Sequence, residues 1–189
     1  MSTGTIIVLV VIVALVGLAI TIYNGLVSGR AQVRNSWSQI DVQLKRRHDL
    51  IPNLVNSVKG EMDFEKGTLT AVIEARSHAV AAKTPQESMQ AENVLTGALG
   101  RFIAVAESYP QLRSHEGVAS LMEELKSTEN KIAFARQHYN DAVQDQNIRI
   151  ASFPNVLLAG PFGFHPETLF QVPEAERAAI DAAPEVKFS

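Results

Sequence analysis

The sequence of 189 residues contains no cysteine. This absence excludes disulfide bonds, thiolate metal ligands and cysteine nucleophiles. Charge is absent from the first 29 residues, so all 17 basic and 20 acidic side chains follow Gly29. The chain therefore joins an apolar N-terminal segment to a charged body, and its length suffices for one membrane segment and one further domain.

Motifs for known catalytic chemistry are also missing. The sequence has no Gly-x-Ser-x-Gly string, no phosphate-binding loop and no dinucleotide fingerprint. A di-iron bundle needs Glu-x-x-His pairs, whereas Glu74 and His78 are four residues apart. His115 and Glu116 do not begin a zinc-protease motif, because Ala119 occupies the place of its second histidine. We therefore expect no catalytic residue, no metal site, no cofactor and no enzyme activity.

Nucleic acid is an unexpected partner for this chain. Its formal net charge is −3 and aromatic residues make up 6% of it, whereas nucleic-acid-binding domains carry basic patches. The short basic cluster Lys45–Arg47 offers anionic lipid as an alternative contact if the helix bends at Gly25 or Gly29.

The charge-free segment predicts a transmembrane helix. Gly4–Leu26 is 23 residues long, roughly 34 Å as helix, which exceeds a hydrocarbon core of about 30 Å. We place the anchor at residues 5–26, after a flank of residues 1–4. The side chains expected to contact lipid are Ile6, Leu9, Ile12, Leu15, Leu18, Ile22 and Tyr23.

A cleaved signal peptide is the alternative interpretation of this segment. It would have a basic start, a shorter apolar core and a small-residue cleavage site, and none of these features is present. Basic residues follow the span at Arg30 and Arg34 and none precedes it. The positive-inside rule then predicts an N-terminus outside and a body in the cytoplasm of a bacterium, with the span in its inner membrane.

The body, residues 27–153, has apolar residues at helical spacing. Leu26, Val33, Ile40 and Leu54 follow one heptad row, which Arg47 interrupts. Thr84 and Glu87 flank Pro85 in a capping box. Pro52 predicts a kink or a new stretch of helix. We expect helices over residues 27–59, 62–82, 85–109 and 115–151. Short connections between them predict an all-α fold, in which the anchor continues into an up-down antiparallel four-helix-type bundle or coiled coil with long first and last helices.

Several strings of the sequence resemble the LemA family of bacterial membrane proteins. They include Lys45–Val55 (KRRHDLIPNLV), Ala104–Pro110 (AVAESYP), Thr128–Ile132 (TENKI) and Phe162–Phe164 (FGF). The resemblance extends from about Tyr23 to Phe170. It implies a cytoplasmic-membrane protein with an all-helical, four-helix-bundle-like body and no established enzymatic activity. Genetic context links relatives in this family to membrane peptidases, envelope processes and signalling.

Polar residues on the first and last body helices predict an interhelical network, because a buried polar group at a core position fixes helix register. A ligand or partner site is the alternative. The residues expected in this network are Arg47, Asp49, Asn53, Glu129, Asn130 and Arg136.

The tail, residues 154–189, is rich in apolar residues, proline and glycine, and we expect a short helix over residues 174–182. One interpretation packs the tail over the end of the bundle. The others use it as a contact with lipid or with another subunit, because apolar surface of this size is seldom left in water. The residues expected in such a contact are Phe153, Leu157, Leu158, Phe162, Phe164 and Phe170.

An anchor, a helical rod and an apolar tail together predict a non-enzymatic membrane scaffold. We expect it to form homo-oligomers, to contact membrane lipid and to organise membrane proteins or membrane structure. The alternative is an adaptor that presents partners to a membrane peptidase or a signalling protein.

Overall fold

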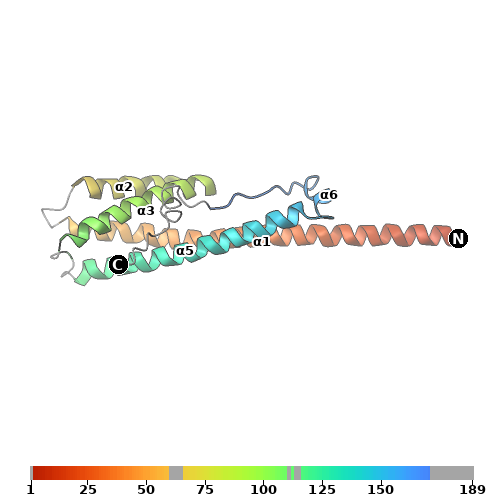
Figure 1. Ribbon diagram of the computed structural model, residues 1–189, viewed down its shortest axis with the longest axis horizontal. Helices are drawn as coiled ribbons and strands as arrows, with labels where there is room; N and C mark the ends of the chain where they lie inside the picture. The colour runs from red at the N-terminus through yellow and green to blue at the C-terminus, as the bar shows by residue number, and fades with distance from the viewer. Residues whose placement is uncertain (1, 60–65, 110–111, 113–115, 171–189) are drawn as a thin grey trace, which may run out of the picture. The chain divides into compact units, whose positions relative to one another are not determined.

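The computed structural model describes residues 2–59, 66–109, 112 and 116–170 (Figure 1). Its helices are α1 (Thr3–Val58), α2 (Lys66–Ala81), α3 (Pro85–Glu107), α5 (Glu116–Ala151) and α6 (Val156–Ala159). The described ranges contain no strand. The prediction of an all-α fold, with an apolar N-terminal helix that continues into a helical bundle, is confirmed.

The chain divides into two compact units. We call Met1–Val42 with Ala133–Leu169 the anchor unit, and we call the unit built around Gln43–Ile132 the bundle unit. Helices α1 and α5 each contribute residues to both units.

Helix α1 is the one described helix that is long and apolar enough to cross a membrane. Its predicted anchor side chains are exposed at Ile6, Leu9, Ile12, Leu15 and Leu18. Exposure of large aliphatic side chains on every side is unfavourable in water and is typical of a helix in lipid. Ile22 differs from this expectation because it is buried among other side chains of the anchor unit.

In the anchor unit, α1 and α5 pack closely at two glycines. The side-chain amide of Gln146 donates to the carbonyl oxygen of Leu26 at 3.2 Å, and Arg149 donates to that of Gly25 at 3.1 Å. A Cβ atom at Gly29 would clash with the Gln146 side chain. A side chain at Gly29 would therefore displace the end of the Gln146 side chain, whereas a Cβ at Gly25 would meet open space.

The segment after α5 returns along the same helix. Asn147 binds the backbone of Glu167 twice: its amide donates to the carbonyl at 2.9 Å, and its oxygen accepts from the N–H at 2.8 Å. The Tyr139 hydroxyl donates to the carbonyl of Thr168 at 3.1 Å. These bonds hold residues 164–169 against α5. The helix expected over residues 174–182 lies outside the described residues.

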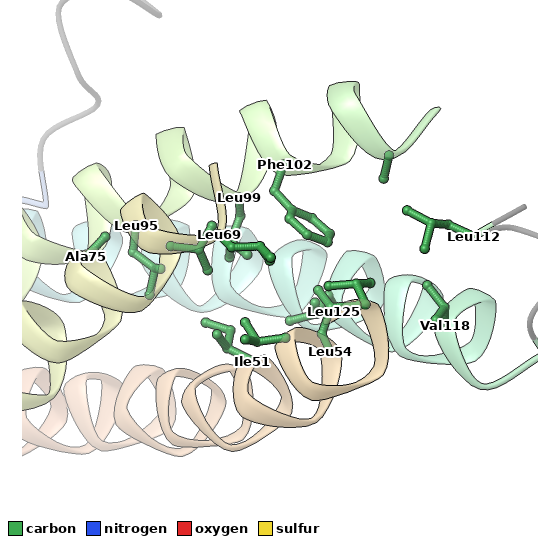
Figure 2. Close-up of a cluster of buried hydrophobic side chains, with 14 of the residues drawn as sticks. Ile51, Leu54, Leu69, Ala75, Leu95, Leu99, Phe102, Leu112, Val118 and Leu125 are labelled. Carbon is green, nitrogen blue, oxygen red and sulfur yellow. The ribbon is translucent and has the colours of Figure 1, made fainter. Parts of the chain in front are cut away.

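In the bundle unit, four helices enclose an apolar core (Figure 2). Helices α2 and α3 lie side by side (Figure 1). The capping box predicted for α3 is confirmed, since the Glu87 N–H donates to the Thr84 hydroxyl and the Thr84 N–H donates to the Glu87 carboxylate. Core residues shown in Figure 2 include Ile51, Leu54, Leu69, Leu95, Leu99, Phe102 and Leu125.

Pro52 lies inside α1, which continues beyond it to Val58. Proline has no N–H, so the carbonyl of His48, four residues earlier, loses its helical donor. The Arg76 Nε of α2 donates to that carbonyl at 2.7 Å. The proline therefore creates an acceptor on α1 that fixes the position of α2.

We predict that Arg76→Met lowers the free energy of unfolding by about 1–2 kcal/mol, because it leaves the His48 carbonyl without a donor in a part-buried site. In a Pro52→Ala background the alanine N–H supplies the helical bond, so the same change should have a smaller effect. Urea unfolding of the four chains in detergent measures this coupling. Equal losses in both backgrounds would contradict it.

Candidate functional site

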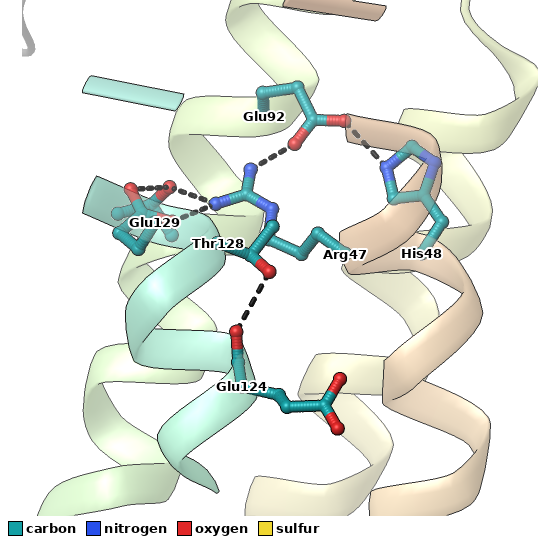
Figure 3. A network of polar contacts seen from close by, with 7 residues as sticks. Arg47, His48, Glu92, Glu124, Thr128 and Glu129 are labelled. Atoms are coloured by element: carbon teal, nitrogen blue, oxygen red, sulfur yellow. Dashed lines mark hydrogen bonds and ion pairs between the residues drawn. The ribbon is translucent and has the colours of Figure 1, made fainter. Parts of the chain in front are cut away.

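Arg47 is the centre of a buried polar cluster in the bundle unit (Figure 3). Its guanidinium is fully buried and forms ion pairs with Glu92 of α3 and Glu129 of α5. It also donates to the Thr96 hydroxyl at 3.0 Å. A buried guanidinium without carboxylates would cost several kcal/mol, so these contacts fix α1, α3 and α5 relative to one another.

Glu92 has a second polar neighbour, the imidazole of His48. Its other carboxylate oxygen lies 2.6 Å from Nε2 of His48 (Figure 3). Burial alone would raise the pKa of Glu92, but hydrogen bonds and charge from His48 and Arg47 outweigh it and leave the pKa below its ordinary value of 4.5. Glu92 is therefore held as the carboxylate.

The six residues of the predicted network do not all meet. Arg47 and Glu129 form an ion pair. Asp49 instead pairs with Lys45 on the surface at 2.9 Å, and this hydrogen bond lowers the pKa of Asp49. Residues two apart on a helix face different directions, which explains why Asp49 points away from Arg47. Asn53 and Asn130 are exposed, and Arg136 is half-buried in the anchor unit.

Sequence reasoning missed Glu92, Thr96 and His48 as members of this cluster. A signal for Glu92 was present, because it lies three residues after Met89 and three before Leu95 on the buried stripe of α3. A carboxylate on an apolar stripe requires a cation opposite it, and Arg47 interrupts the apolar row of α1 in the same way.

A groove of about 670 Å³ runs between α3 and α5 of the bundle unit. Leu99, Ile103, Met122 and Leu125 form its apolar walls. Its charged residues are Glu107, Glu123, Glu129 and Lys126, so acidic groups predominate. Gly100 also lines the groove, and a Cβ there would meet open space.

The predicted tail contact separates into exposed and buried residues. Phe153, Leu157 and Phe162 are exposed at 80%, 63% and 53%. Leu158 is half-buried. Phe164 and Phe170 are buried within the chain, so these two residues do not offer surface to lipid or another subunit. Phe164 is buried because it packs with Ile22, Leu26, Ile150 and Ala159.

No group of three or more histidine, aspartate or glutamate side chains is arranged to hold a metal ion within the described part of the chain. The Arg47 cluster brings two carboxylates and an imidazole together, but its guanidinium occupies the space between the carboxylates (Figure 3). Its geometry is that of an interhelical ion-pair network.

An apolar helix able to span a bilayer and a bundle joined by buried ion pairs define a membrane-associated helical-bundle protein. The family model described as "LemA family" matches residues 36–188. The chain therefore belongs to the LemA family, as the sequence strings predicted.

Curated relatives are similar over most of their length. Magnetosome protein MamQ 2 of Paramagnetospirillum magneticum is 26% identical, over 85% of this chain and 68% of the relative. Protein LemA of Metamycoplasma hominis is 25% identical, over 85% of this chain and 74% of the relative. Magnetosome protein MamQ of Magnetospirillum gryphiswaldense is 24% identical, over 75% of this chain and 62% of the relative.

We predict that Glu92→Gln lowers the free energy of unfolding at neutral pH by about 2–3 kcal/mol, because it weakens a buried ion pair. A depressed pKa in the folded state contributes stability above the ordinary pKa and loses it as pH falls through the folded value. The difference between wild type and variant should therefore shrink as the pH falls below the ordinary pKa of Glu92, 4.5, toward its lower folded value.

Glu124→Gln is the matched control for this change, because Glu124 pairs with Arg46 at 3.4 Å on a half-exposed surface. It should alter stability by less than about 0.5 kcal/mol. Unfolding curves at several pH values measure both variants, and equal effects of the two would refute the structural role of Glu92.

Proposed function

We propose that this protein is a membrane-anchored, non-catalytic scaffold that assembles with copies of itself. The observation that carries the proposal is the α3–α5 groove, whose apolar and acidic lining residues match a surface of the same bundle unit. That surface is the outer stripe of α2. A groove on one copy filled by a different surface of the next copy is a heterologous contact, which builds rings or filaments.

The α2 stripe has the composition that this groove favours. Lys66, Ile73 and Val80 recur at intervals of seven residues and all three side chains are exposed, so they lie along one side of the helix. Lys83 is exposed two residues beyond the helix end, and Glu74 is the one acidic residue between Lys66 and Lys83. A cationic, apolar stripe complements an acidic, apolar groove.

Membrane attachment would turn such contacts into a scaffold. Helix α1 contains both the apolar span and part of the bundle unit, so a copy bound at the groove is also tethered to lipid. Confinement to a membrane raises the effective concentration of weakly associating sites. The LemA and MamQ relatives support a role at membranes.

A different occupant of the same groove defines the alternative function. An adaptor would use its acidic groove to bind a basic amphipathic helix of another membrane protein, such as a membrane peptidase or a signalling protein. A chain that remains monomeric in detergent and in lipid nanodiscs would favour this adaptor and overturn self-assembly.

We predict that Gly100→Trp reduces the assembly to single chains, because the indole fills the groove. Gly97→Trp is the matched control: Gly97 is exposed on the same helix, a Cβ there meets open space, and it does not line the groove. Ile73→Ser with Val80→Ser should act like Gly100→Trp. Mass photometry in mild detergent measures each species.

Mixing the two assembly-deficient variants tests the heterologous geometry. The Gly100→Trp chain retains an intact α2 stripe and the serine variant retains an intact groove, so the mixture should form pairs with one working interface and nothing larger. A mixture that stays monomeric would contradict the α2-in-groove contact. The contact would also be contradicted if both variants formed assemblies of the same mass as the wild type.

We further propose that the N-terminus lies outside the bacterial inner membrane and that the body lies in the cytoplasm, because Arg30 and Arg34 follow the span. Since the chain has no cysteine, single-cysteine variants report the orientation directly. A membrane-impermeant maleimide should label Ser2→Cys in intact cells and Ala82→Cys only after lysis. The reverse pattern would overturn this orientation.

A further inference from the structure

The segment Phe153–Phe162 of the anchor unit exposes large apolar side chains that the assembly contact does not use. Phe153, Val156, Leu157 and Phe162 are all exposed. We call this segment the foot. On α1, Tyr23 and Val27 are also exposed, and Tyr23 packs edge-on against Phe162 with ring centroids 5.2 Å apart.

The foot is held against α1 at the place where the charge-free run ends. Tyr23 also packs against Phe164 at 5.9 Å. Arg30, the first charged residue of the chain, donates to the carbonyl of Gly163 at 2.6 Å and lies 4.1 Å above the Phe164 ring. Gly163 has φ +70°, a conformation that glycine adopts without strain.

This position lies at a bilayer boundary if α1 spans the membrane. Thr3–Ile22 comprises 20 residues of α1, about 30 Å of helix, which equals the thickness of a hydrocarbon core. Tyr23 then lies at the interface, where aromatic residues are enriched. Because Tyr23 contacts Phe162 directly, the exposed side chains of the foot lie at the same boundary.

Charge near the foot favours the same surface. Residues 1–40 and 146–166 contain no aspartate or glutamate. They do contain Arg30, Arg34 and Arg149, which suit the phosphates of a headgroup layer. A protein surface with exposed aromatic and aliphatic groups, adjacent cations and no anions is typical of an interfacial membrane contact.

We propose that the foot is a second membrane contact, in which Phe153, Leu157 and Phe162 insert into the headgroup–acyl boundary beside the end of the α1 span. The occupant of this apolar surface is the lipid bilayer. The contact is independent of the groove in the bundle unit, so its loss leaves self-assembly intact.

Spin labels test the foot in the full chain, which offers no competing cysteine. Nitroxides at Leu157→Cys are compared with those at Leu15→Cys in the span and at Phe134→Cys. Phe134 is the aqueous control, since it belongs to the same unit on α5 and is 72% exposed. The protein is placed in vesicles of three parts phosphatidylcholine and one part phosphatidylglycerol.

Collision rates with oxygen and with a water-soluble nickel chelate report depth in the bilayer. The ratio of oxygen to nickel rates at Leu157 should exceed that at Phe134 several-fold and fall below that at Leu15. A ratio equal to that at Phe134 overturns the lipid contact. Low collision rates with both reagents, together with dipolar broadening between labels, would also overturn the lipid contact. This result would identify a second copy of the chain as the occupant. Mass photometry of the same variants shows whether they still self-assemble, and so distinguishes failure of the lipid contact from failure of self-assembly.

Discussion

The burial of one guanidinium is the constraint on which the bundle unit depends. Arg47 is fully buried, and a cation removed from water is tolerated only where carboxylates meet it. Those carboxylates come from α3 and α5. The next residue, His48, completes the arrangement, since its imidazole meets Glu92 and its carbonyl accepts from Arg76 of α2. Two adjacent residues of α1 therefore determine the register of the three other helices, a task that apolar side chains perform poorly because their packing is not directional.

The same cluster connects the core to the surface that we propose for assembly. Thr96 and Glu129 contact Arg47 and also line the α3–α5 groove. The spacing of the groove walls therefore depends on the buried ion pair. An uncharged core would be equally stable or more stable in many proteins. The ionic core here is better explained by the defined separation of α3 and α5 that it imposes, because a groove selects its occupant by shape as well as by charge.

The sequence predicted the features that repeat or that depend on neighbours along the chain. The apolar periodicity predicted an all-α fold, and the capping box at Thr84 and Glu87 located the start of α3. Contacts between distant segments were harder. Glu92 was missed because a single carboxylate in an apolar stripe has no local partner, and Arg76 was missed because its acceptor exists only where Pro52 removes an N–H. The tail shows both a predictable and an unpredictable feature. Its apolar content can be read from the sequence, but the turn at Gly163, which separates exposed Phe162 from buried Phe164, cannot.

The foot would restrict what a chain of groove contacts can build. A single transmembrane helix is free to rotate about its own axis, and interfacial anchors limit that rotation and the tilt. Tyr23 packs against Phe162 of the foot, and Arg30 donates to the adjacent Gly163, so a foot in the headgroup layer gives the anchor unit of every copy the same face toward the membrane surface. Heterologous contacts between copies held at one depth must repeat about an axis normal to the bilayer. Under that restriction they close into rings or extend within the plane of the membrane, whereas the same contacts free in solution also permit helical filaments.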